Sequence, residues 1–251
     1  MSSPATHPPA THPPAGFDAD LGDAIAAGLH GPPPADLAAF ESAFVALVEA
    51  GDPLPERAWD NFYDRTLARV EGRWDAATGA SNIATFSRIW ARATALSRGS
   101  SVLDIGTCFG FLPLTWAARP GAPALLAVEL SPAAAALAGR QARRLSRTVT
   151  VLCADGTRLP LRDRAVSTAL VLHVLEHLDQ PASERLLTEA LRVADRRVVV
   201  AVPVEDRPDP LFGHLQVFDL AGLAERGRRT GWRISVADAD TDGAWLVLDR
   251  R

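Results

Sequence analysis

The sequence predicts an α/β fold: a seven-stranded, mostly parallel sheet with an antiparallel C-terminal hairpin, preceded by an N-terminal helical segment. Three observations support this. Beyond residue 100, stretches typical of buried strands alternate with helical periodicity, which implies a parallel sheet with helices on both faces. The first strand runs into a glycine-containing loop that opens a helix. Strands expected near 232–237 and 244–248 are too close for a parallel crossover, so they must pair antiparallel.

Composition divides the chain into three parts. Residues 1–35 contain eight prolines and the tandem repeat Ala-Thr-His-Pro-Pro, and such a segment has too little apolar surface to fold. Helical periodicity then continues to about residue 98, where the alternation of strands and helices begins. We therefore expect a disordered Pro/Ala-rich tail at 1–35, a helical cap at 36–98 and an α/β domain at 99–251.

The cap is expected to contain three helices, because apolar residues recur at three- and four-residue steps around 37–48, 59–70 and 82–97. Aromatic side chains lie on the apolar faces, and the favoured interpretation is that they form hydrophobic core. The alternative is a lid over a binding site, with Tyr63 and Arg65 as its polar contacts.

The elements of the α/β domain follow from local signals. Ser131 is a good helix N-cap and Pro132 a good first helical residue. The turn-forming pair Asp242-Gly243 joins the two final strands. Strands are predicted at about 101–105, 124–129, 149–153, 166–172, 196–203, 232–237 and 244–248, and helices near 110–118, after 132, and near 182–193 and 220–230.

The loop after the first strand is the strongest functional signal. Gly106 and Gly110 let the backbone turn sharply and let a ligand approach closely, and Asp104 puts a carboxylate beside the strand end. The next strand ends on Glu129, 23 residues past Gly106, a spacing that suits a carboxylate accepting hydrogen bonds from two ribose hydroxyls. A nucleoside-bearing cofactor is predicted at this place.

The glycine spacing distinguishes between cofactor classes. A dinucleotide-binding fingerprint requires G-x-G-x-x-G, and this chain has Cys108 and Phe111 where the second and third glycines belong, which disfavours NAD and FAD. The stretch resembles the first motif, D-x-G-x-G-x-G, of class I S-adenosylmethionine-dependent methyltransferases, with Cys108 in place of the middle glycine. That resemblance implies a Rossmann-like fold and S-adenosyl-L-methionine as cofactor, bound by Asp104, Gly106, Cys108, Gly110 and Glu129. The antiparallel final hairpin agrees with it.

A further carboxylate follows the third strand, in the segment that contains Asp155 and Gly156. Ligands of such sheets lie outside the carboxyl ends of the strands. The resemblance implies that Asp155 accepts a hydrogen bond from the adenine amino group and that Gly156 lies beside it. The alternative is an Asx-turn, in which the Asp155 side chain bonds its own backbone and needs no ligand.

Three of the six histidines follow predicted sheet strands: His173 and His177 after the fourth strand, and His214 after the fifth. Methyl transfer to a hydroxyl requires the hydroxyl to lose its proton, and a histidine with a pKa near 6.5 is a suitable base. We predict His177 or His214 in that role, with His173 lining the cofactor or methyl-transfer pocket. The alternative is that these histidines only cap and pack.

The same cluster permits a metal-binding interpretation. In some quinone-biosynthesis O-methyltransferases a Glu-x-x-Glu-His run at this position binds a divalent metal, and here the run is His-x-x-Glu-His, at His173, Glu176 and His177. Two imidazoles and a carboxylate suit zinc or another transition ion better than magnesium. A divalent metal is possible but not expected, because Leu-Glu-His-Leu is common in metal-free members of the methyltransferase superfamily.

A narrower resemblance rests on two segments and on the helical region from about 37 to 97. Cys-Phe-Gly-Phe-Leu-Pro-Leu at 108–114 and Leu-Phe-Gly-His-Leu-Gln-Val-Phe-Asp at 211–219 look like the mycofactocin-associated oligosaccharide methyltransferases. This resemblance implies O-methylation of a glucose hydroxyl on a glycosylated, peptide-derived redox cofactor.

Composition limits the partners and the compartment. A formal net charge of -4 gives no basic stripe for nucleic acid or an anionic membrane. The two cysteines do not form a metal-type pair, so reduced thiols and a cytoplasmic location are expected. The apolar run near Val198 is too short to span a bilayer, and the first basic residue is Arg57, so neither a membrane span nor a secretory signal is predicted.

The sequence is compatible with other functions. A phenol, carboxylate or amine acceptor is equally compatible with every feature above. An NAD-dependent oxidoreductase is disfavoured by the glycine pattern and the final hairpin. A non-catalytic binding module with the same fold is the third alternative, because a fold alone does not establish activity.

Overall fold

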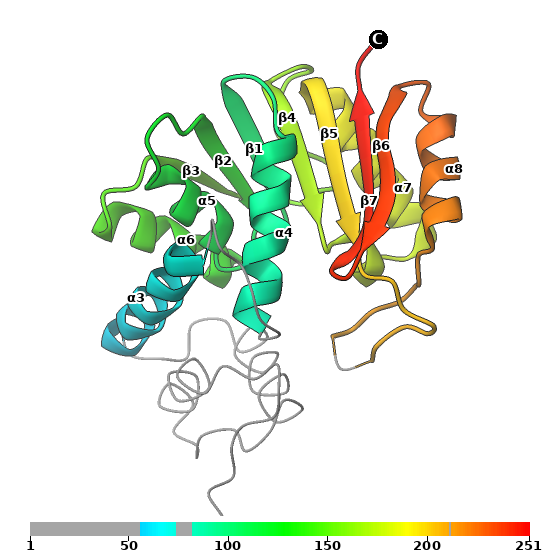
Figure 1. Ribbon diagram of the computed structural model, residues 1–251. Helices are drawn as coiled ribbons and strands as arrows, with labels where there is room; N and C mark the ends of the chain where they lie inside the picture. The colour runs from blue at the N-terminus through cyan, green and yellow to red at the C-terminus, as the bar shows by residue number, and fades with distance from the viewer. Residues whose placement is uncertain (1–55, 74–81, 211) are drawn as a thin grey trace, which may run out of the picture.

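The computed structural model describes residues 56–73, 82–210 and 212–251 (Figure 1). The predicted tail at 1–35 and the predicted helix at 37–48 lie outside the described residues.

A seven-stranded sheet forms the centre of the described structure, in the order β3-β2-β1-β4-β5-β7-β6. The first five strands pair in parallel, while β7 pairs antiparallel with both β5 and β6. This confirms the predicted mixed sheet with its C-terminal hairpin. The strands are β1 Ser101–Ile105, β2 Ala124–Glu129, β3 Val149–Cys153, β4 Val166–Leu172, β5 Ala194–Val202, β6 Arg233–Asp240 and β7 Gly243–Asp249.

Most of the predicted helices are found within a few residues of their expected limits. Ser131 caps its helix as predicted, since its side chain accepts a hydrogen bond from the Ala134 N–H. One helix begins earlier than predicted because Asp179 accepts from the Ala182 N–H and so caps a helix that starts at Gln180. The helices are α3 Glu56–Arg73, α4 Asn82–Leu96, α5 Phe111–Ala117, α6 Pro132–Arg144, the short 3-10 helix η1 Leu175–His177, α7 Gln180–Val193 and α8 Leu220–Arg229.

The helices cover both faces of the sheet. Successive residues of a strand point to opposite faces, so Val102 joins one core cluster and Leu103 the other. The cluster on the first face includes residues of α3, α4, α5 and α6, and the cluster on the second includes residues of α7 and α8. A strand segment buried from both sides is apolar, which is why 169–172 of β4 and 198–202 of β5 read as continuous hydrophobic runs.

Helix α3 lies beside α4 and α5, on the side where the first strand ends (Figure 1). The aromatic side chains Trp59, Phe62 and Tyr63 are fully buried, which confirms that they form core. The hydroxyl of Tyr63 donates a hydrogen bond to the backbone carbonyl of Phe109, 2.8 Å away, and Arg65 is exposed. Tyr63 therefore supports the loop after β1 instead of presenting its hydroxyl to a substrate.

Ion pairs attach α4 to the hairpin of β6 and β7. Arg88 contacts the carboxylate of Asp242 in the turn, and Arg92 contacts Asp238 and Asp240 of β6. Helix α4 is thus held against the hairpin at one edge of the sheet. Among the described helices, none has the combination of length and apolar character that crossing a lipid bilayer requires.

Candidate functional site

The loop after β1 turns sharply over the end of β2. The backbone N–H groups of Gly106 and Thr107 both donate to the carbonyl of Val128, at 2.8 and 3.0 Å. Gly106 has a φ of 76°, and a Cβ at this position would lie 2.7 Å from a methyl carbon of Val174. Only glycine fits both the backbone angle and the space, so the predicted role of Gly106 in shaping the loop has a steric basis.

Cys108 occupies the left-handed region of backbone space, with a φ of 52°. This is the conformation that a glycine adopts without cost, and a non-glycine residue there is strained by about 1–2 kcal/mol. The backbone N–H of Cys108 donates to Glu129, which helps to hold that conformation. The departure from the family's glycine motif therefore changes the residue but leaves a glycine-like loop. Burial raises the pKa of the Cys108 thiol to about 12.

Glu129, at the end of β2, accepts one backbone hydrogen bond on each carboxylate oxygen. The donors are Cys108 N–H at 2.8 Å and Ser131 N–H at 2.9 Å. A carboxylate oxygen can accept more than one hydrogen bond, so both oxygens retain capacity for hydroxyl donors. This geometry suits the predicted contact with two ribose hydroxyls.

Asp104 lies inside the fold, beneath the loop. Its carboxylate accepts a hydrogen bond of 2.7 Å from the Thr107 hydroxyl and is 6% exposed. Burial raises the pKa of Asp104 to about 6, and the nearby charge of Glu129 raises it further while the Thr107 hydrogen bond opposes the rise. Asp104 therefore shapes the loop from beneath through Thr107.

Asp155 follows β3 and forms the Asx-turn that was the alternative to a ligand contact. Its Oδ1 accepts a hydrogen bond of 2.8 Å from the Thr157 N–H, and this bond lowers the pKa of Asp155. The Asx-turn uses only one of the two carboxylate oxygens. At Gly156, a Cβ would lie 2.9 Å from Ile105 and 3.1 Å from Leu186, so the absence of a side chain serves the packing of the sheet against α7.

The first histidine of the predicted cluster, His173, follows β4 directly. It has a φ of 53°, and its N–H donates to the Ala201 carbonyl of β5. Its ring lies edge-on to Phe86 of α4, and its Nδ1 is 3.5 Å from Glu176 Oε1. Burial lowers the pKa of His173 to about 4, and the nearby histidines lower it further.

Glu176 is the most deeply buried carboxylate of the cluster, with a side chain 1% exposed. Within the described part of the chain, neither of its carboxylate oxygens has a hydrogen-bond partner. Burial raises the pKa of Glu176 to about 8. Its isolation could not be predicted from the sequence, because the run His-x-x-Glu-His does not indicate which side chain faces inward.

The other two histidines meet across the chain. His177 extends from η1, and His214 extends from the loop that follows β5; their ring centroids are 4.8 Å apart, with the rings nearly perpendicular. His214 Nδ1 lies 2.8 Å from Glu205 Oε2. Burial lowers the pKa of His177, and the neighbouring His214 lowers it further. Sequence reasoning named both histidines but missed Glu205, which lies in the same irregular loop and carries no motif.

Hydrogen bonds attach the loop that carries His214 to η1. The Leu215 N–H donates to the Glu176 carbonyl at 2.7 Å. The side-chain amide of Gln216 donates to the carbonyls of Leu175 and Leu178, while its oxygen accepts from Arg226 of α8. These contacts hold His214 beside His177.

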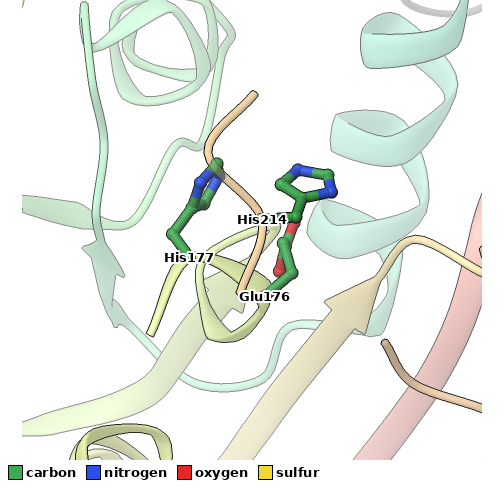
Figure 2. A group of neighbouring side chains, drawn as sticks. All are labelled: Glu176, His177 and His214. Carbon is green, nitrogen blue, oxygen red and sulfur yellow. The ribbon is translucent and has the colours of Figure 1, made fainter. Parts of the chain in front are cut away.

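Three of these side chains could hold a metal ion: Glu176, His177 and His214. One ligand atom from each lies within 4.8 Å of the other two (Figure 2). This set differs from the sequence-based one, in which His173 stood in place of His214. Figure 2 shows Glu176 and His177 extending from η1 toward the place that His214 reaches from its loop.

The site lies at the edge of the sheet where ligands of this topology bind. The loop after β1, Glu129 after β2, the histidines after β4 and His214 after β5 all follow the carboxyl ends of parallel strands. A surface hollow of about 430 Å³ lies at the opposite edge, among Ser100, Trp116 and Pro123. None of the predicted site residues lines it.

Comparisons with known proteins agree on the class of this domain. Residues 102–196 match the family model described as a methyltransferase domain. The chain is 32% identical over 143 residues to an uncharacterized methyltransferase of Mycolicibacterium vanbaalenii. That alignment covers 55% of this chain and 46% of the relative, so the chain spans about half the length of the curated relative it matches.

Solved structures share the fold. A SAM-dependent methyltransferase from Aquifex aeolicus is 19% identical, with a TM-score of 0.51 over 64% of this chain and 87% of its own. The magnesium protoporphyrin IX methyltransferase of Synechocystis PCC 6803, solved with bound SAM, is 15% identical, with a TM-score of 0.52 over 82% and 89%. The [4+2]-cyclase SpnF is 25% identical, with a TM-score of 0.53 over 62% and 60%.

The fold and the site together define an α/β domain whose candidate site lies at the carboxyl ends of its parallel strands. Residues 102–196 match the methyltransferase domain model, and the fold is shared with SAM-dependent methyltransferases. The predicted fold is confirmed, and these matches support the predicted enzyme class and cofactor.

Proposed function

We propose that the protein transfers the methyl group of S-adenosylmethionine to a hydroxyl of a small-molecule acceptor. The observation that carries this proposal is the pair His177 and His214, which meet at the carboxyl ends of β4 and β5, beside the loop after β1. An acceptor hydroxyl placed there would lie next to imidazoles suited to removing its proton.

The reaction is an in-line displacement. The acceptor oxygen attacks the methyl carbon, the carbon–sulfur bond breaks, and S-adenosylhomocysteine leaves with the electron pair of that bond. An imidazole nitrogen of His177 or His214 accepts the hydroxyl proton, and that ring becomes an imidazolium. Because the positive charge of the sulfonium disappears in this step, the chain needs to position the two reactants more than to stabilise new charge.

The cofactor contacts follow from the first three strand ends. Glu129 accepts hydrogen bonds from the ribose hydroxyls, and the segment 106–110, including Cys108, passes close to the cofactor. Asp155 accepts from the adenine amino group with the carboxylate oxygen that the Asx-turn leaves free, beside Gly156. His173 lines the pocket between the cofactor and the histidine pair, since its backbone follows β4 and its ring points toward Glu176.

The acceptor that we propose is a glucose hydroxyl of a mycofactocin-type oligosaccharide. The supporting observations are the segments 108–114 and 211–219, which resemble that group of enzymes. The second segment contains His214, and Glu205 lies in the same loop, so the acceptor side of the site offers polar groups to a polyhydroxy ligand.

We further propose that 36–98 acts as a cap on the domain at 99–251, that 1–35 is a disordered tail, and that the protein works in the cytoplasm with its two free cysteines reduced.

Calorimetric titration of the purified chain with S-adenosylmethionine, S-adenosylhomocysteine and NAD tests the cofactor. We expect micromolar binding of the two sulfur nucleosides and none of NAD. Binding of NAD alone would contradict the proposal and favour an oxidoreductase.

An acceptor screen tests the reaction. Glycosylated cofactors, phenols, carboxylates and amines are incubated with S-adenosylmethionine, and products are identified by mass and by the methylated atom. We expect methyl ethers of sugar hydroxyls. N-methylated or esterified products would replace the proposed acceptor class, and cofactor binding without transfer to any acceptor would favour the non-catalytic alternative. The fold alone does not require methyl transfer, because SpnF shares this fold and is a [4+2]-cyclase.

A further inference from the structure

The Glu176 carboxylate is buried without the partners that a buried carboxylate requires. Its side chain is 1% exposed, and within the described residues its oxygens accept no hydrogen bond. His173 Nδ1 lies 3.5 Å from Glu176 Oε1, beyond a normal hydrogen bond to a carboxylate. Burying such a group costs several kcal/mol unless it is paired or coordinates a metal. A cation bound beside Glu176 would supply the missing partner of its ionised form.

Two imidazoles complete a set of ligands around that carboxylate. One ligand atom of each of Glu176, His177 and His214 lies within 4.8 Å of the other two. Tetrahedral coordination at about 2.1 Å separates ligand atoms by about 3.4 Å, so modest side-chain rotations would close the set around an ion. Figure 2 shows the three side chains converging from η1 and from the loop after β5.

His214 also has the supporting hydrogen bond that metal-binding histidines show. Its Nδ1 lies 2.8 Å from Glu205 Oε2, and when Nδ1–H donates to this carboxylate the tautomer is fixed. The lone pair then lies on Nε2, the nitrogen that would bind the ion. A metal-ligating histidine almost always donates its other N–H to a carboxylate, a carbonyl or water.

The loop that carries His214 is held in place before any ion binds. Leu215 bonds the Glu176 carbonyl directly, and Gln216 bonds both Leu175 and Leu178. The ligands from two separate strand ends are thus linked through their backbones as well as through their side chains. Such preorganisation is what makes a three-ligand site effective.

We propose that Glu176, His177 and His214 bind a divalent first-row transition ion of the zinc class, with Glu205 supporting His214. Two nitrogens and one carboxylate disfavour magnesium and calcium, which take oxygen ligands. Three protein ligands leave a coordination position open, as in catalytic zinc sites. The role of that position rests on the proposed function: an acceptor hydroxyl bound there becomes more acidic and releases its proton to solvent water, while His177 and His214 hold the ion instead of taking the proton themselves.

Cobalt titration of the chelator-treated, full-length chain tests the site directly. Co²⁺ gives a visible absorption band when histidines and a carboxylate bind it, and Zn²⁺ should displace it. We expect one ion per chain and loss of the band in Glu176→Gln, His177→Gln and His214→Gln. Glu205→Gln, which keeps all three ligands, should weaken binding by about 10- to 100-fold.

Two controls make the result specific. His173→Asn removes the histidine outside the proposed set, and asparagine tolerates the left-handed backbone there, so cobalt affinity should be unchanged. Replacing His7, His12 and His30 by glutamine removes every histidine outside this cluster, and affinity should again be unchanged. Circular dichroism and urea unfolding verify that each variant is folded.

Absence of stoichiometric cobalt and zinc binding would overturn the proposal. So would binding that survives all three ligand variants and disappears with the tail histidines. Methyl transfer at an equal rate by chelated and zinc-loaded protein would overturn the ion's part in the reaction, while leaving the methyltransferase proposal intact.

Discussion

The carboxylate of Glu129, at the end of β2, accepts a hydrogen bond of 2.8 Å from the backbone N–H of Cys108 in the loop after β1. One side chain thus fixes the loop conformation and, in the proposed complex, holds the ribose. Substitution separates degrees of this loss: glutamine at position 129 keeps one oxygen acceptor, whereas alanine keeps none.

Glu129→Ala should weaken S-adenosylmethionine binding by about 10- to 100-fold, because hydrogen bonds to a charged group contribute about 1.5–3 kcal/mol each. Isothermal titration gives the dissociation constant. Glu129→Gln is the matched control and should lie between the wild type and the alanine variant. An unchanged dissociation constant in Glu129→Ala, in a folded protein, would contradict the ribose assignment.

His177→Ala and His214→Ala should each slow turnover at saturating cofactor by about 100-fold or more, because the acceptor then lacks the centre that removes its proton. Single-turnover methyl transfer measures this rate, and titration should show cofactor affinity close to that of the wild type. Full activity in both variants would eliminate the histidine pair from the mechanism.

Asp104 should make the stability of the cofactor-free protein depend on pH. Its folded pKa is raised from 3.8 to about 6, so the folded state keeps a proton that the unfolded state releases. The free energy of unfolding should therefore fall as the pH rises from about 4 to 6, by roughly 2–3 kcal/mol from this group.

Urea unfolding of the wild type and Asp104→Asn at pH 4 and pH 7 tests this prediction. Asparagine cannot ionise, so the variant should gain stability relative to the wild type as the pH rises. Parallel pH profiles would show that Asp104 has an ordinary pKa in the folded protein.

The two cysteines should differ in reactivity. Burial raises the pKa of Cys108 to about 12, and only the thiolate is a good nucleophile, whereas Cys153 is exposed. Treatment with iodoacetamide at pH 8, followed by peptide mass mapping, should label Cys153 and spare Cys108. Unfolding in urea should abolish the difference; equal labelling of the folded protein would contradict the prediction.

The strands and helices could be predicted because their signals are local. A buried strand such as β5 shows its apolar run over 198–202, and the Ser131 cap stands directly before its helix. The ends of a helix differed from their predicted positions where a capping side chain set them, as Asp179 sets the start of α7.

The candidate site was only partly predictable, because its key contacts join residues far apart in the chain. The histidines stood out by their position after strands, but the contact of His214 with His177 depends on how an irregular loop folds onto η1. Glu205 lies in an irregular loop, so no repeating sequence pattern predicts its contact with His214. Tyr63 and Phe109 are 46 positions apart, so the support of the glycine loop by a cap helix also appears only in the folded structure.

The ion pairs between α4 and the hairpin have a consequence for the order of assembly. Arg88 and Asp242 are 154 positions apart, so the ribosome must complete most of the chain before they can meet. Strands β1 to β4 and the loop after β1 contain only earlier residues. We expect the nucleoside-binding half to become compact first during synthesis, and the hairpin to dock onto α4 as a late, slower event.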